Sequence, residues 1–121
     1  MSTLNVSNIS DGTDTVETGY VVNGSAKAFV HGDETAAILK SFNVSTGTDH
    51  GTGDYSYALV SAMDSNNYSM PCCVRSGTPD RNARRNSTRD SASVMAIGTS
   101  NARLNSNVDH IQNATLHGDL A

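Results

Sequence analysis

Between residues 19 and 70 the chain alternates apolar and polar side chains over short stretches separated by turn-forming residues. Tyr55 and Tyr57 begin one such stretch, with the two-residue period of a strand that buries one face. Residues 41–45 alternate in the same way. The intervening residues 46–54 contain three glycines and two aspartates, a composition that reverses the chain. We therefore predict a β-hairpin whose loop is longer than a two-residue turn.

Other parts of the chain show the same strand signals. Asn23 and Gly24 form a favoured tight-turn dipeptide that would divide the strand region 19–30 into two pieces. Pro71 interrupts an alternating stretch and marks an edge strand or a bulge, because proline cannot donate to the ladder. Further strands are predicted within residues 68–74, 93–98 and 108–121. Many short strands with little helix signal predict an all-β fold, a compact antiparallel β-sandwich or jelly-roll-like domain.

The size and composition of the chain limit how much core it can build. Its 121 residues are enough for one domain, only 5% of them are aromatic, and tryptophan is absent. Asn, Ser and Thr make up about a third of the chain, which favours turns and short strands over long helices. A core this thin stabilises a monomer weakly, so we expect the chain to oligomerise.

The first 19 residues differ from the rest of the chain. Leu4, Val6 and Ile9 are the only aliphatic side chains before Val16 in a segment of small and polar residues. Such a segment cannot bury enough apolar surface to fold alone. We expect an extended N-terminal arm over residues 1–19 that adds a strand to a neighbouring chain, with a frayed terminus as the alternative. Residues 20–121 would then form the β-sandwich domain.

Arginines are concentrated in residues 75–93, which we interpret as a long loop because of their Gly, Pro, Asn and Ser content. Four of them lie within nine residues: Arg81, Arg84, Arg85 and Arg89. The segment has no aromatic residue for stacking on bases, and the net charge of the chain is −4, so nucleic acid is not an expected partner. Guanidinium groups bind carboxylates in planar pairs, which favours salt bridges to another protein surface.

A search for catalytic or metal-binding patterns gives little. The four histidines are not spaced as metal ligands, and the glycines at 51 and 53 lack the setting of a phosphate-binding loop. Cys72 and Cys73 are neighbours that would point to opposite faces of a strand and so would not bridge each other. We expect no enzymatic activity, no cofactor and no metal, and keep a small hydrolase or a lectin-like binder as the weakest alternative.

The N-terminal residues lack the basic start and apolar run of a signal peptide, and no stretch of the sequence is apolar enough to span a membrane. The sequence thus predicts synthesis in a cytoplasm without export, and no membrane partner.

Three runs, residues 22–28, 41–45 and 49–55, resemble a repeat-like module in virion surface proteins of tailed bacteriophages. The two ends, residues 2–6 and 116–119, are similar to the ends of such chains. The module occurs in capsid decoration proteins, head fibres and tail-fibre tips. Residues 72–101 carry no such resemblance.

This resemblance implies a homotrimeric structural protein of the virion, made in the host cytoplasm, that decorates or cements the major capsid protein shell as a decoration protein or short head fibre. The alternative is a tail-fibre or receptor-binding tip that contacts a host surface glycan or protein. On either interpretation, the expected capsid or intersubunit interface is formed by Leu4, Val6, Ile9, Arg81, Arg84, Arg85 and Arg89.

Overall fold

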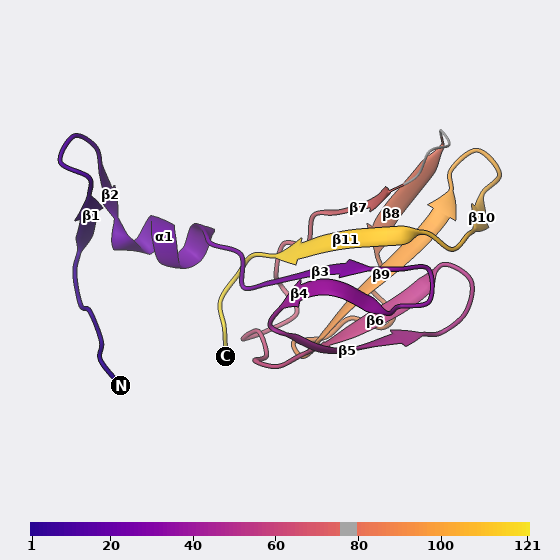
Figure 1. Cartoon of the computed structure of the whole chain (residues 1–121), viewed down its shortest axis with the longest axis horizontal. Helices are drawn as coiled ribbons and strands as arrows, with labels where there is room; N and C mark the ends of the chain where they lie inside the picture. Colours follow the sequence, from indigo (N-terminus) through magenta and orange to yellow (C-terminus); the bar gives the residue numbers. More distant parts are fainter. Residues whose placement is uncertain (76–79) are drawn as a thin grey trace.

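The computed structural model describes residues 1–75 and 80–121, which form two packed antiparallel sheets and an N-terminal arm (Figure 1). The first sheet has the order β4-β3-β11-β7. Its strands are β3 Ala28–Gly32, β4 Ile38–Phe42, β7 Cys72–Arg75 and β11 Ile111–Leu116. The second has the order β10-β9-β6-β5, with β8 also paired to β9. Its strands are β5 Val44–Asp49, β6 Asp54–Leu59, β8 Arg81–Arg85, β9 Val94–Asn101 and β10 Ser106–Asn107. This architecture confirms the all-β prediction.

The core lies between the two sheets and is built from alternating strand positions. Tyr55, Tyr57 and Leu59 of β6 are buried, which confirms the alternation predicted for this strand. Met95 and Ile97 are fully buried on β9, the strand between β6 and β8. The first sheet contributes a smaller set of buried side chains: Ala28, Val30, Ala114 and Leu116.

Two glycines make room for Tyr57 in this core. A Cβ atom at Gly32 would lie 1.9 Å from the Tyr57 hydroxyl oxygen. A Cβ at Gly47 would lie 2.0 Å from the Ala36 carbonyl oxygen and 2.9 Å from the Tyr57 ring. Any larger side chain at either position would displace the ring or the backbone, because interiors are close-packed.

The chain passes from one sheet to the other at Asn43. This residue has a φ of 56°, a left-handed conformation that asparagine tolerates better than most residues. Its amide nitrogen donates to the carbonyl oxygens of Lys27 and Ser61, each over 3.0 Å, and its side-chain oxygen accepts from Ser61 N over 2.7 Å. The prediction of one strand over residues 41–45 was therefore wrong, because β4 ends at Phe42 and β5 begins at Val44.

The hairpin that follows is longer than predicted. Strand β5 extends to Asp49, well inside the predicted loop 46–54, and pairs with β6 in the antiparallel direction. The reversal is confined to residues 50–53, where Asp54 N donates to Gly51 O over 2.9 Å. Residues 46–48 pair with β6 in spite of the glycine at 47. The prediction from glycine content therefore made the loop too long.

The arm is more structured than an extended terminus, and in the structure it reaches residue 24 instead of residue 19. It contains a small hairpin of β1 Asn8–Ser10 and β2 Thr15–Glu17, followed by helix α1 Thr18–Gly24. A strand was expected from residue 19 onward, and this was wrong, since β3 starts only at Ala28. A strand needs a neighbour, whereas a helix bonds within itself, as Ser25 N does to Val21 O over 3.2 Å. The arm projects from one end of the body (Figure 1).

The segment around the arginines contains the end of β7 and the whole of β8, so it is not one long loop. Strand β7 pairs with β11, and it is an edge strand, as Pro71 predicted. Strand β8 carries Arg81, Arg84 and Arg85 and pairs along its whole length with β9. The predicted loop 75–93 was wrong for residues 75 and 81–85, whereas residues 86–93 do connect β8 and β9 outside the strands. Its residues 76–79 lie outside the described part. An arginine-rich segment can form this strand because β9 supplies its backbone hydrogen-bonding partners.

Candidate interaction surfaces

One face of the β4-β3-β11-β7 sheet points away from the core. Directly opposed residues form two rows across its strands, as the pairings of Phe29 with Phe42 and of His31 with Lys40 show. β11 continues both rows, with Thr115 opposite Phe29 and Asn113 opposite His31, and β7 continues the second row with Cys73. We call this surface the outer face and define it by seven residues: Phe29, His31, Lys40, Phe42, Cys73, Asn113 and Thr115.

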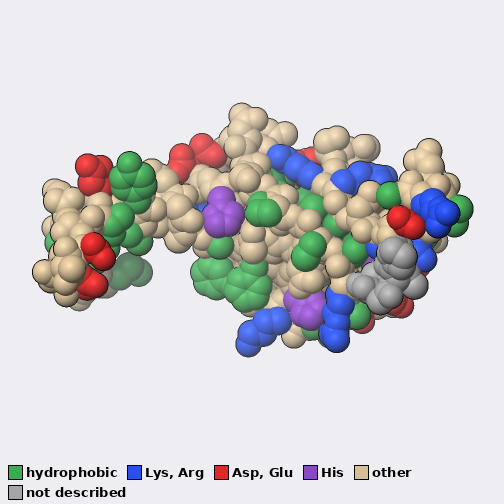
Figure 2. Space-filling model, turned by 90° about the horizontal axis from the view of Figure 1, so that it is seen from above, with side chains coloured by type: hydrophobic (Ala, Val, Ile, Leu, Met, Phe, Trp, Pro, Cys, Tyr) green, Lys and Arg blue, Asp and Glu red, His purple; other side chains and the backbone are tan. Residues whose placement is uncertain are grey.

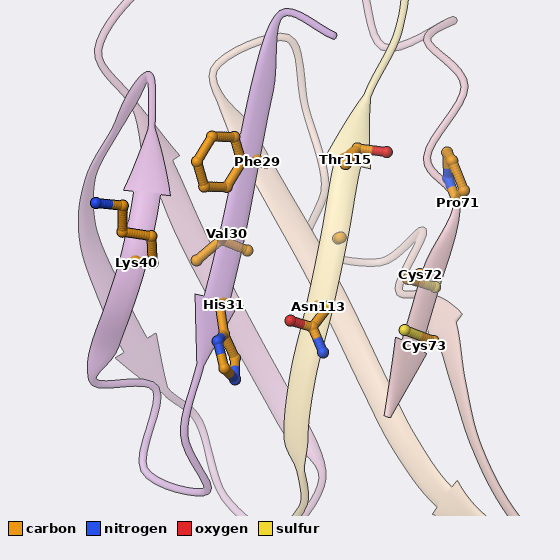
Figure 3. A pocket seen from close by; sticks show the side chains of 10 residues that line it. Phe29, Val30, His31, Lys40, Pro71, Cys72, Cys73, Asn113 and Thr115 are labelled. Carbon is orange, nitrogen blue, oxygen red and sulfur yellow. The ribbon is translucent and has the colours of Figure 1, made fainter. Parts of the chain in front are cut away.

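The outer face combines an aromatic pair with a shallow groove. The rings of Phe29 and Phe42 stack with centroids 6.4 Å apart and an angle of 25°, although Phe42 is 57% exposed. An open depression of about 560 Å³ runs from Phe29 across β3 and β11 to Pro71 on the β7 side (Figure 3). Exposed rings beside a groove are typical of a surface that binds another molecule.

The polar groups of the outer face lack partners within the described residues. His31 Nε2 is buried and forms no hydrogen bond with any described residue. The side chains of Lys40, Asn113 and Thr115 line the same groove. They form no hydrogen bond with any described residue. Buried polar groups normally find partners, so this groove offers unused hydrogen-bonding capacity. The face carries positive charge from Lys40, and none of its seven residues is acidic.

The two cysteines lie on opposite faces of β7, as predicted. Cys73 is exposed on the outer face, whereas Cys72 is half-buried and packs against the core. Both are free thiols, and burial raises the pKa of the Cys72 thiol. Cys73 is therefore the thiol that a reagent in solution would reach first.

The arm exposes nearly all of its apolar surface. Every residue from 1 to 24 is exposed except the half-buried Thr18. Leu4 is 84% exposed, and Ile9 is 45% exposed in the small hairpin. The described residues include thirteen exposed large hydrophobic side chains, and eight of them lie in this arm. No residue of the arm belongs to the core cluster formed by the described residues. Leu4, Val6 and Ile9 therefore remain available to a partner, while their role as an interface remains a prediction.

The arginines predicted for an interface are used within the chain. The Arg85 guanidinium bonds to the Asp90 carboxylate, with Nε 2.6 Å from Oδ2, and lies 4.3 Å from the centroid of the Tyr68 ring. The Asp90 side chain is only 2% exposed. Arg85 thus neutralises a buried carboxylate and packs on an aromatic face, which makes it part of the fold.

The other three arginines differ in exposure and partners. Arg89 Nε donates to Asp54 over 2.8 Å at the rim of the body, where the Arg89 side chain is 41% exposed. Arg84 lies over Gly98 and donates to Ser100 Oγ over 3.2 Å. Arg81 is half-buried at the start of β8. Sequence reasoning missed these partners because Asp54 is 35 positions from Arg89 and nothing local pairs them.

A polar contact that the sequence did not predict closes one end of the sandwich. Asp109 Oδ1 accepts from Gly53 N over 2.7 Å and from the Tyr55 hydroxyl over 2.8 Å. Burial, together with the Asp109 carboxylate, raises the pKa of Tyr55 well above its usual range. The contact ties the β5–β6 turn to the segment before β11, so it serves the fold.

No three His, Cys, Asp or Glu side chains among the described residues lie close enough together to hold a metal ion. Nor does any helix formed by these residues have the length and apolar character needed to cross a bilayer. Comparison of the chain with protein-family models, with curated proteins and with solved structures found no match in any of the three.

Proposed function

We propose that this protein is a non-enzymatic structural protein of a phage virion, a decoration protein or short head fibre on the major capsid protein shell. The observation that carries the proposal is the division into a compact β-body and a projecting arm with exposed aliphatic side chains (Figure 1). The resemblance of residues 22–28, 41–45 and 49–55 to virion surface modules supplies the context.

Within one copy, the arm has little to pack against. A two-stranded hairpin and a seven-residue helix are each marginal in water unless they pack on something. No arm residue belongs to the core cluster formed by the described residues, so a partner in an assembly would stabilise the arm. We therefore assign the arm to attachment and the β-body to the exposed, decorating part of the molecule.

A second candidate is a tail-fibre or receptor-binding tip that contacts a host surface glycan or protein. The groove of the outer face favours it, because its side chains His31, Lys40 and Asn113 have unused hydrogen-bonding capacity above an apolar floor.

Copy number in purified virions separates the two. Quantitative mass spectrometry would give a decoration protein at a ratio to the major capsid protein close to a simple fraction, and a tail tip at a few copies per particle. Absence from virions would refute both.

Attachment is tested with particles that lack the protein. Purified full-length chain should co-sediment with them, and the double substitution Leu4→Asp and Ile9→Asp should abolish this. Leu104→Asp is the matched control, because Leu104 is 71% exposed on the β-body. Equal binding by all three proteins would remove the arm from the attachment role.

A further inference from the structure

Two surfaces, the arm and the outer face, have no partner among the described residues, and they are complementary in charge. We propose that the arm of one copy lies across the outer face of a second copy, so that copies join arm to sheet. This inference goes beyond the proposed function, because it gives the arm a contact surface on a second copy of the chain and not on the shell.

The apolar side chains of the two surfaces are complementary. The arm offers aliphatic residues that are exposed at Leu4, Val6 and Ile9, and the outer face offers the stacked rings of Phe29 and Phe42. Removing such surfaces from water favours the contact. Neither surface can obtain this stabilisation within one isolated copy.

Their charges are also complementary. Residues 1–26 hold three acidic side chains, Asp11, Asp14 and Glu17, and no lysine or arginine. The outer face holds Lys40 and His31 and no carboxylate. Figure 2 shows acidic and hydrophobic side chains together on the arm. Opposite charges placed in this way set the register of a contact and exclude wrong partners.

A second copy fits better than the same chain. The arm leaves the body before Ala28 and projects away from it (Figure 1). A hydrogen bond ties the arm to the body at its base. It joins Gly24 O and His117 Nδ1 over 3.1 Å. A contact between different patches of two copies is head-to-tail, and it generates a closed ring when the rotation closes. A ring of three would be the expected homotrimer.

The test is a charge swap in the full-length protein, read out by light scattering over a range of concentrations. Lys40→Glu, on the outer face, should weaken assembly at least about tenfold, and so should Asp14→Lys with Glu17→Lys in the arm. The triple variant, in which both surfaces are reversed, should recover affinity to within about threefold of the unmodified protein. The matched control is Arg103→Glu, a charge reversal at a side chain 81% exposed on a distant turn, which should leave assembly unchanged.

Three results would overturn the inference: a monomer at every concentration, an oligomer that neither reversal weakens, or a triple variant that assembles as weakly as either reversal alone. If the variant with Leu4→Asp and Ile9→Asp lost particle binding but kept its oligomeric state, the inference would be refuted and the proposed function would stand. Conversely, an oligomer that follows the charge swap but is absent from virions would support the inference and refute the proposed function.

Discussion

Gln112 Nε2 donates a hydrogen bond to the Tyr57 hydroxyl over 2.6 Å, and neither side chain is exposed to solvent. Gln112 lies on β11 and Tyr57 on β6, so the bond crosses the core from one sheet to the other. Gln112 Oε1 has no partner among the described residues. This directional contact fixes how the two sheets face each other, which apolar packing alone specifies less tightly.

Tyr57→Phe should destabilise the protein by about 1–3 kcal/mol, because it leaves the Gln112 amide buried without any partner. The free energy of unfolding in urea measures the loss. Adding Gln112→Met should recover part of it, since both partners are then apolar. A single variant as stable as the unmodified protein would contradict the assigned role of this bond.

Gly32→Ala should also destabilise the fold, by about 1–3 kcal/mol, because the new methyl group would overlap the Tyr57 hydroxyl. Gly19→Ala is the control, as no atom lies within 4 Å of a Cβ built there. Thermal unfolding of both variants distinguishes a steric effect from a general loss of glycine. Comparable midpoints for the two would show that the space beside Tyr57 is not tight.

Stability should fall as the solution is made alkaline between pH 10 and 12. Burial raises the pKa of Tyr57 from 10.0 to about 12, so the folded chain holds this proton more tightly than the unfolded chain does. The resulting stabilisation is fully present below pH 10 and is lost as the pH rises through the folded pKa. Unfolding free energies measured across this range should decline less steeply in Tyr57→Phe. The slope does not vanish there, because burial raises the pKa of Tyr68 as well.

Asn43→Ala should cost more than Asn105→Ala. Both residues have a positive φ, 56° and 49°, so each alanine pays about 1–2 kcal/mol for the left-handed backbone. Only Asn43 also loses hydrogen bonds to Lys27 O, Ser61 O and Ser61 N. The difference between the two unfolding free energies isolates those bonds. Equal costs would mean that the corner between the sheets does not depend on the Asn43 side chain.

Arg85→Ala should cost about 3–5 kcal/mol, because it strands the Asp90 carboxylate, whose side chain is 2% exposed. Arg89→Ala removes a pair with a partly exposed arginine and should cost less than about 1 kcal/mol. Denaturant unfolding at low and high salt measures both, and only the Arg89 effect should shrink in salt. If both variants lost a similar, small amount of unfolding free energy, Arg85 would not be stabilising a buried carboxylate.

Much of the strand pattern was readable from the sequence. Alternation at Tyr55, Tyr57 and Leu59 identified the buried face of β6, and Pro71 marked an edge strand. These features are local, since a two-residue period places every second side chain on the same face wherever the strand lies. The exposed aliphatic residues of the arm were likewise visible as a segment too poor in apolar residues to fold alone.

Other features were decided only by the tertiary structure. Alternation across Asn43 reads as one strand, yet Phe42 and Val44 belong to different sheets, because a period reports a buried face and not which sheet a strand joins. Residues 20–22 have strand propensity but lie in α1, where no neighbouring strand can complete a ladder. Arg85 and Arg89 became structural because the fold brings Tyr68 and Asp54 beside them. The outer face exists only because β3, β7 and β11, which are distant in sequence, pair so that His31, Asn113 and Cys73 lie side by side.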